Sequence, residues 1–197
     1  VYKPTPLISA PGMAQYLGVK SILIKDEGQR LPVKSFKALG ATYALSESLR
    51  DVLESLTGTR PSHHDIFKRQ IDLPADLYVV AATDGNHGRA LAWGAHQFGV
   101  PCRIYLPRNV SQSRADAIAE LGAELVFFDA NYDETLQICI NDAAEHGWLH
   151  IQDTSQPGLE ESHKVIMEGY SLMGDEIVQQ LPTGEIPSHL FIQVGCG

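Results

Sequence analysis

Apolar and polar residues alternate in blocks through the middle of the chain, and the lengths of these blocks indicate secondary structure. Four apolar runs have the length of a strand, and each of the first three is followed by a segment with helical periodicity. The predicted strands are Leu77–Ala82, Cys102–Leu106, Leu125–Phe128 and Trp148–Ile151, and the predicted helices are Gly88–Phe98, Ser111–Leu121 and Tyr132–His146. Alternation at intervals of about 22 to 24 residues is typical of βαβ units. The pattern predicts the α/β class, with an open, doubly wound parallel sheet covered on both faces.

The region before these units is less regular. A helix is predicted over Phe36–Leu56, where apolar residues recur at three- and four-residue steps. Ahead of it, the pattern indicates a helix over Pro11–Leu17 and a short strand over Ser21–Lys25. The stretch Thr57–Leu73 collects turn-forming residues and is assigned to a surface excursion.

The region after these units departs from the regular spacing. A helix is predicted over Ser162–Gln180 and an apolar strand over Leu190–Val194. That strand leads into Gly195-Cys196-Gly197, and a glycine loop after a strand normally precedes a helix that binds an anion at its N-terminus. We therefore expect the chain to be a fragment, with an incomplete second domain.

Composition excludes several classes of protein. The formal net charge is -9, from 15 basic and 24 acidic residues, and no Lys/Arg cluster marks a phosphate-binding face, which argues against a nucleic-acid partner. No apolar run approaches the ~20 residues of a membrane span and the chain does not open with a signal pattern, so we expect no membrane partner and a cytoplasmic location. Cys102, Cys139 and Cys196 are widely spaced, so neither a disulfide framework nor a zinc or other metal site is expected.

Lys37 is the first candidate for chemistry, because it lies in the first turn of the helix predicted over Phe36–Leu56. The positive end of the helix dipole and the unpaired N–H groups disfavour a cation at this position. The same field, with apolar surroundings, lowers the pKa of an ammonium group and frees its lone pair for attack on a carbonyl. A Schiff-base lysine needs such an environment. The sequence leaves open the alternative of an exposed lysine whose stem lies across Phe36.

Three loops follow predicted strands, at the edge of an open α/β sheet where ligands bind. The first, Thr83–Gly88, combines glycines with the neutral amide of Asn86; the second carries Asp153; the third holds Gly195 and Gly197. The first loop lacks the opening glycine of a dinucleotide motif, so NADP is not favoured. A buried lysine, an amide-bearing glycine loop and a second glycine loop fit an aldehyde cofactor with a phosphate tail, and pyridoxal phosphate meets that description.

Two motifs carry a resemblance to a known superfamily. Ser35-Phe36-Lys37 with Gly40-Ala41, followed by Gly85-Asn86-His87-Gly88, resembles the fold-type-II pyridoxal-phosphate enzymes, the tryptophan synthase β and threonine dehydratase superfamily. Within it, the stretches Thr83–Arg89, Gln152–Thr154 and Ile166–Tyr170 resemble the diaminopropionate ammonia-lyase family.

The resemblance implies a role for each matching residue. Lys37 would form the Schiff base with pyridoxal 5'-phosphate, and Asn86 would contact the phenolic oxygen of the cofactor. The remaining implied positions are Gly85, His87 and Gly88 beside Asn86, the carboxylates of Asp84 and Asp153 near the substrate, and Gly195 and Gly197 at the phosphate. It also implies that residues 1–36 belong with a large cofactor domain, that 37–160 form a smaller α/β domain, that 161–197 begin the large domain, and that the full-length protein is a homodimer.

The expected activity is α,β-elimination of ammonia from 2,3-diaminopropionate, a small amino acid, to give pyruvate and ammonia. The leaving amine is cationic at neutral pH, and a carboxylate at Asp84 would attract it. Two carboxylates and Lys37 would place bases on both faces of the substrate, so that both stereoisomers react. Alternatives stay open: a threonine or serine dehydratase, a non-catalytic α/β module, and structural roles in which Asp84 caps the next helix and Asp153 orders its own turn.

Overall fold

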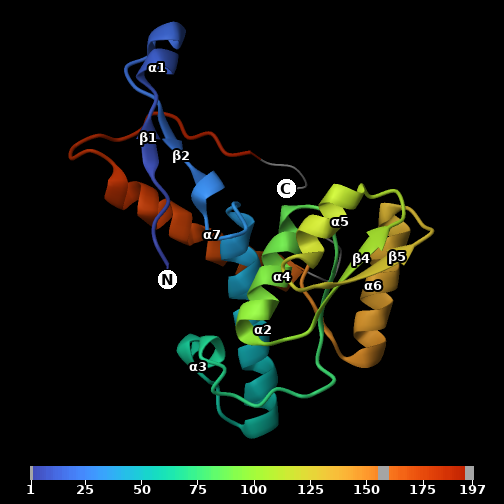
Figure 1. Cartoon of the computed structure of the whole chain (residues 1–197). Coiled ribbons are helices and arrows are strands. Elements are labelled where there is room, and N and C mark those ends of the chain that lie inside the picture. Colours follow the sequence, from blue (N-terminus) through green and yellow to red (C-terminus); the bar gives the residue numbers. More distant parts are fainter. Residues whose placement is uncertain (1, 155–159, 194–197) are drawn as a thin grey trace.

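The computed structural model describes residues 2–154 and 160–193, and its central feature is a four-stranded sheet with the order β5-β4-β3-β6 (Figure 1). The strands are β3 (Val79–Ala82), β4 (Cys102–Pro107), β5 (Glu124–Phe128) and β6 (Leu149–His150), and all neighbours run parallel. From β3 the chain moves outward to β5 and then returns to the other side of β3, which is the change of direction of a doubly wound sheet. The predicted α/β fold with a parallel sheet is confirmed.

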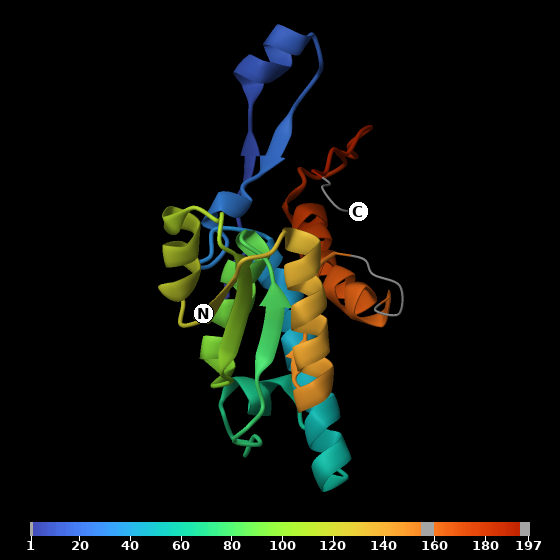
Figure 2. The same ribbon diagram turned by 90° about the vertical axis from the view of Figure 1, so that its right-hand side faces the viewer.

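Helices cover both faces of this sheet, which explains why β3 is apolar at every position. The covering helices are α2 (Lys37–Thr57), α4 (Asn86–Phe98) and α5 (Gln112–Ala119) on one side and α6 (Tyr132–His146) on the other (Figure 2). Val79 and Ala81 belong to the core with the first three helices, and Val80 and Ala82 to the core with α6. Successive strand residues point to opposite faces, so each of these four side chains is fully buried.

Local sequence sets the ends of the covering helices. At the start of α6, Asn131 Oδ1 accepts from the Glu134 N–H at 2.9 Å, and the Glu134 carboxylate accepts from the Asn131 N–H at 2.9 Å. Gly99 and Gly147 follow α4 and α6 in the left-handed conformation, with φ of 77° and 68°, which side chains disfavour and which terminates a helix. The helix predicted over Tyr132–His146 is therefore confirmed to the residue.

The N-terminal residues form an arm that projects from the sheet (Figures 1 and 2). Its elements are β1 (Leu7–Ser9), α1 (Pro11–Leu17), β2 (Leu23–Lys25) and the single 3₁₀ turn η1 (Glu27–Gln29). The two strands pair antiparallel, with Leu7 opposite Lys25. The helix predicted over Pro11–Leu17 is confirmed, and the predicted surface excursion contains the last residue of α2 and the short helix α3 (His63–Phe67).

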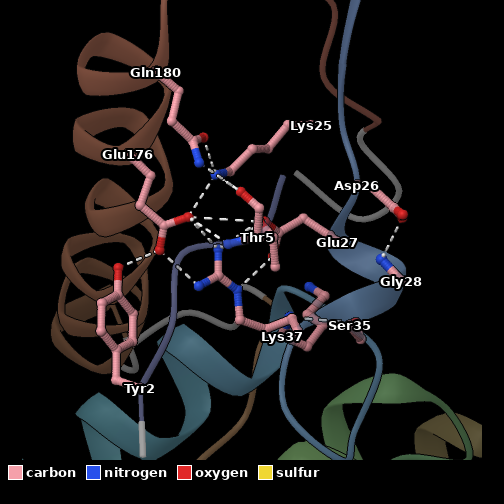
Figure 3. Close-up of polar contacts among 11 residues, drawn as sticks. Tyr2, Thr5, Lys25, Asp26, Glu27, Gly28, Ser35, Lys37, Glu176 and Gln180 are labelled. Atoms are coloured by element: carbon pink, nitrogen blue, oxygen red, sulfur yellow. Dashed lines mark hydrogen bonds and ion pairs between the residues drawn. The ribbon is translucent and has the colours of Figure 1, made fainter. Parts of the chain in front are cut away.

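A buried ion cluster joins this arm to α7 (Glu160–Gln180) (Figure 3). The Arg30 side chain is 1% exposed and donates to Glu176 Oε1 from Nη1 and to Glu27 Oε1 from Nη2, each at 2.7 Å. Lys25 Nζ lies 2.6 Å from Glu176 Oε2, and the Tyr2 hydroxyl donates to the same carboxylate. Charges buried this deeply are tolerated only when they are paired, so the cluster fixes the arm against α7.

Two glycines allow α7 to cross α2 at very short range. A Cβ atom on Gly40 would lie 2.5 Å from Tyr170 Cε1 and 2.7 Å from the carbonyl oxygen of Ile166. A Cβ on Gly169 would lie 2.6 Å from the carbonyl oxygen of Leu39. Only hydrogen fits at either position, and this close crossing places Tyr170 beside the start of α2.

One predicted strand is absent. Residues 190–193 have no regular structure, and Leu190 and Phe191 are 69% and 90% exposed, so the prediction of a strand over Leu190–Val194 is wrong for the residues described. An apolar run becomes a strand only where a sheet edge pairs with its backbone, and neither sheet of the described residues includes residues 190–193. Gly195 and Gly197 lie outside the described residues. Within the described ranges no helix has the length and apolar character to cross a membrane.

Candidate active site

Lys37 is the first residue of α2, and its amine points to the carboxyl ends of the strands rather than to open solvent. The Nζ atom lies 2.8 Å from Asp153 Oδ2, 5.4 Å from the centre of the Phe36 ring and 5.6 Å from that of Tyr170. The side chains of Lys37 and Asp153 are 28% and 15% exposed. Lys37 is therefore partly buried rather than exposed, because an ion pair and two aromatic rings lie beside the amine.

The charge on this amine differs from the expectation. Burial lowers the pKa of Lys37, but the hydrogen bond to Asp153 and the attraction of its charge raise it more, so the pKa lies above the ordinary value. The prediction of an unprotonated resting amine is wrong. The helix dipole and the apolar surroundings are outweighed by one carboxylate, 116 residues away in sequence, at hydrogen-bond distance.

His87 approaches the same carboxylate from α4. Its ring is 2% exposed, and Nε2 lies 2.8 Å from the carbonyl oxygen of Ile151, which can only accept, so Nε2 carries the proton. The other ring nitrogen, Nδ1, lies 3.7 Å from Asp153 Oδ2. Burial lowers the pKa of His87, which keeps the ring neutral at pH 7. Burial alone raises the pKa of Asp153, but the hydrogen bond and the charge of the Lys37 ammonium lower it overall, so this carboxylate is ionised.

Asp153 thus brings two of the predicted loops together with the predicted lysine. Its Oδ2 atom contacts Lys37 from α2 and faces His87 from the Thr83–Gly88 loop and α4, although these residues are far apart in sequence. The turn that Asp153 would order with the residues after it lies outside the described residues.

The Thr83–Gly88 loop leaves the N-terminus of α4 open. The residue before the helix is Gly85, and no side chain caps the helix, so the alternative in which Asp84 is the cap is wrong. A Cβ on Gly85 would meet nothing within 4 Å, whereas a Cβ on Gly88 would lie 3.1 Å from the carbonyl oxygen of Thr83. Gly88 is therefore needed for the close turn, and Asn86, which is exposed, has an amide available to a ligand beside uncapped N–H groups.

Asp84 lies in a neighbouring cavity instead of against Lys37. Its Oδ2 atom accepts from Arg114 Nη1 at 2.6 Å. The cavity has a volume of about 610 Å³, a size suited to a small ligand, and its polar lining residues are Asp84, Asn109, Ser111, Arg114, Asn131 and Tyr132. The Tyr132 hydroxyl accepts from Gln152 Nε2 at 3.1 Å, which links the cavity wall to the residue before Asp153.

Three residues of this region were not predicted from the sequence as site residues. Tyr170 packs against the Lys37 amine, Arg114 pairs with Asp84, and Gln152 contacts the end of β3. Tyr170 and Gln152 fall in stretches that carried the family resemblance, and that was the only signal. Arg114 lies on a helix with no distinguishing motif.

The described residues fit pyridoxal phosphate. Lys37 would offer the amine for its aldehyde, Asn86 would offer an amide for its ring oxygen, and the open N-terminus of α4 would offer backbone donors for negatively charged oxygens. At Gly85, which has no side chain, the cofactor could approach the backbone closely.

Comparison with known proteins identifies the class. The chain belongs to the family of pyridoxal-phosphate-dependent enzymes, whose family model matches residues 1–197. It is 39% identical to the diaminopropionate ammonia-lyase of Escherichia coli (strain K12) over 197 residues, which is 100% of this chain and 48% of that protein. It is 27% identical to the L-threonine ammonia-lyase of Geobacter sulfurreducens over 119 residues, 60% of this chain and 27% of that one. The chain thus spans about half the length of the diaminopropionate ammonia-lyases that it matches.

Solved structures agree with the sequence comparison. The apo form of the Escherichia coli diaminopropionate ammonia-lyase superposes with a TM-score of 0.84 at 37% identity, covering 95% of this chain and 51% of that one. The same enzyme in complex with D-serine gives a TM-score of 0.78 at 39% identity, covering 91% and 45%. The resemblance to fold-type-II pyridoxal-phosphate enzymes is therefore confirmed.

Proposed function

We propose that the protein is a pyridoxal-phosphate-dependent lyase that eliminates ammonia from 2,3-diaminopropionate. The observation that carries this proposal is the placement of the Asp153 carboxylate, 2.8 Å from the Lys37 amine and 3.7 Å from the His87 ring. A lysine beside an ionised carboxylate, at the edge of a parallel sheet and in a chain of this family, has the setting of a cofactor-binding and proton-transferring lysine. The identity of 39% to a diaminopropionate ammonia-lyase favours this substrate.

The proton on Lys37 determines how the site would work. The amine is protonated at rest, so it must lose a proton to solvent before it can bind an aldehyde, and Asp153 Oδ2, at hydrogen-bond distance, would hold the amine in place. When bound, pyridoxal phosphate supplies the electron sink that stabilises negative charge at the substrate α-carbon. Lys37, once neutral, would then take the α-proton on its own side of the substrate.

Charge accounts for the preference for a diamino substrate. The leaving β-amine is cationic at neutral pH, and the carboxylates of Asp84 and Asp153 would attract it, whereas a hydroxyl leaving group carries no charge. Asp84 is held by Arg114 in an exposed pair, with the Arg114 side chain 64% and the Asp84 side chain 40% exposed, and such pairs are weak enough for a substrate cation to displace. Asp84 would also serve as the base for the opposite stereoisomer.

A second candidate is a dehydratase of hydroxyl amino acids. The observation that favours it is the 28% identity over 193 residues to the biosynthetic L-threonine dehydratase of Haemophilus influenzae. The two activities share the lysine chemistry and differ in the group that leaves.

A substrate comparison separates these candidates. The protein, loaded with pyridoxal phosphate, is assayed for ammonia and keto-acid release from both isomers of 2,3-diaminopropionate and from serine and threonine. We expect kcat/KM for diaminopropionate to be highest, and Asp84→Asn to lower it more for one isomer than for the other. Preference for serine or threonine would establish the dehydratase, and a colourless, inactive protein would establish a non-catalytic module.

The organisation of the whole protein is part of the proposal. We infer that the 1–36 segment and residues from 161 onward belong to one large domain and that 37–160 form the smaller one. The ion pairs of Glu176 with Lys25 and Arg30 support this division, because they tie the N-terminal arm to α7. A homodimer in the cytoplasm is expected from the family resemblance, and sedimentation analysis with cell fractionation tests both points.

A further inference from the structure

Gln152 lies two residues beyond the end of β6. Its side chain is fully buried, and both polar atoms of its amide bond to the backbone of one residue of β3. The Ala82 N–H donates to Gln152 Oε1 at 3.1 Å, and Gln152 Nε2 donates to the Ala82 carbonyl oxygen at 2.9 Å.

The side chain takes the place of a backbone pair in the sheet. The ladder between β3 and β6 runs through the N–H of Leu149 to the carbonyl of Tyr78 at 2.9 Å and the N–H of Ile151 to that of Val80 at 3.1 Å. The next step of a parallel ladder would join Ala82 to the carbonyl of residue 151 and the N–H of residue 153. Ala82 instead has both backbone groups satisfied by the Gln152 amide.

Because of this exchange, β3 does not bond to two backbone groups that would otherwise continue the ladder, the Ile151 carbonyl and the Asp153 N–H. The Ile151 carbonyl, no longer needed by β3, accepts from His87 Nε2 at 2.8 Å. The chain can turn away from the sheet at residue 153, and the Asp153 carboxylate then lies 2.8 Å from Lys37 Nζ. The Gln152 amide also donates to the Tyr132 hydroxyl at 3.1 Å, on the wall of the neighbouring cavity.

We propose that Gln152 is a positioning residue of the active site, whose amide replaces the last backbone pair of β3 and β6 so that Ile151 orients His87 and Asp153 faces Lys37. Its catalytic importance rests on the proposed function; the positioning itself does not. The proposal requires one donor and one acceptor at this point, which an amide side chain provides in a fixed geometry.

Gln152→Glu gives a pH-dependent test of this requirement. A carboxylate has the same size and accepts from the Ala82 N–H, but it cannot donate to the Ala82 carbonyl and repels it. A buried carboxyl group takes up a proton more readily than an exposed one, and the protonated acid regains the donor. The defect should therefore be present at pH 8 and be relieved at pH 5.5. Gln137→Glu, on an exposed part of α6, is the matched control.

Two measurements on the cofactor-free protein report the positioning. Selective ¹⁵N-histidine NMR follows the Nε2–H of His87, and NMR of ¹³C-methylated lysine follows the pKa of Lys37, which Asp153 raises in the native protein. In Gln152→Glu we expect the Nε2–H signal of His87 to be lost at pH 8 and to return at pH 5.5, and the pKa of Lys37 to fall. Gln137→Glu should match the wild type in both.

A second variant, Gln152→Asn, tests the proposal even if Gln152→Glu does not fold at pH 8. Gln152→Asn keeps the amide but is one methylene short, and it should shift both signals in the same direction. If a folded Gln152→Glu or Gln152→Asn keeps the wild-type His87 signal and Lys37 pKa, the proposal is overturned. Failure of the proposed function is distinguishable, because it would appear as absence of cofactor at Lys37 while these signals still respond to Gln152.

Discussion

Replacing Glu176 by Gln tests the buried ion cluster that joins the N-terminal arm to α7. The Glu176 side chain is 3% exposed, accepts from Arg30 Nη1 at 2.7 Å and lies 2.6 Å from Lys25 Nζ. Gln has nearly the same size, so the change removes the charge and leaves the packing. The buried cations Arg30 and Lys25 then lose an anionic partner, and an unpaired buried charge is strongly destabilising.

The size of the effect follows from the pKa of Glu176. Burial raises this pKa, but the hydrogen bonds from Arg30 and Lys25 lower it by a larger amount, so the pKa falls from its ordinary value of 4.5 to about 2. At about 1.4 kcal/mol for each pKa unit, this difference corresponds to about 3 kcal/mol. That value agrees with the range of about 3 to 5 kcal/mol for breaking a buried ion pair. Because the folded-state pKa is depressed, the stabilisation is complete above about pH 4.5 and is lost as the pH falls through about 2.

Urea denaturation followed by tryptophan fluorescence measures this loss. At pH 7 we expect Glu176→Gln to lower the free energy of unfolding by about 3 kcal/mol, and the difference from wild type to shrink as the pH approaches 2. The control is Glu185→Gln, whose partner Lys20 lies 3.7 Å away with a side chain 87% exposed, and it should cost less than about 0.5 kcal/mol. A loss below about 1 kcal/mol for Glu176→Gln, or a difference that does not vary with pH, would refute this reasoning.

Three further changes test the region around the lysine. Gly169→Ala forces a Cβ to within 2.6 Å of a backbone carbonyl of α2, so we expect a loss of about 1 to 3 kcal/mol in thermal unfolding, and an unchanged midpoint would contradict the close crossing. Asp153→Asn removes the charge that raises the pKa of Lys37, so acylation of that amine should become fast at a lower pH than in the wild type. A variant whose acylation rate has the same pH profile as the wild type would count against the pairing. Arg114→Gln releases Asp84, so KM should fall for diaminopropionate and stay constant for serine, whereas equal changes would exclude a charge effect.

The sheet could be predicted from the sequence because its inner strand β3 is apolar without interruption. β3 is buried on both faces, so Val79 to Ala82 are all apolar. A continuous apolar run of this length is typical of a parallel strand that helices cover on both faces. The bounds of α6 were predictable because its caps are local: Asn131 and Glu134 are three residues apart, and Gly147 follows directly. The strand predicted at residues 190–194 is wrong for the described residues 190–193, because apolar character alone does not supply a pairing edge.

Part of the candidate site could be predicted from the sequence, whereas its electrostatics could not. Lys37 and Asp153 were found from a helix start and a strand end, but the distance between them depends on how distant segments pack. The charge of Lys37 follows from that distance, and so the sequence pointed to the wrong protonation state. The cluster of Arg30 and Glu176 could not be predicted for the same reason, since its partners are 146 residues apart.

The central claim is that Lys37 is the residue that binds pyridoxal phosphate. Borohydride reduction of the protein mixed with pyridoxal phosphate, followed by mass spectrometry of its peptides, tests it most directly. We predict that the modified peptide carries the cofactor on Lys37, that Lys37→Ala abolishes the label, and that replacing the exposed Lys20 with Ala leaves it intact. Label absent from Lys37, or spread evenly over exposed lysines, would contradict the account.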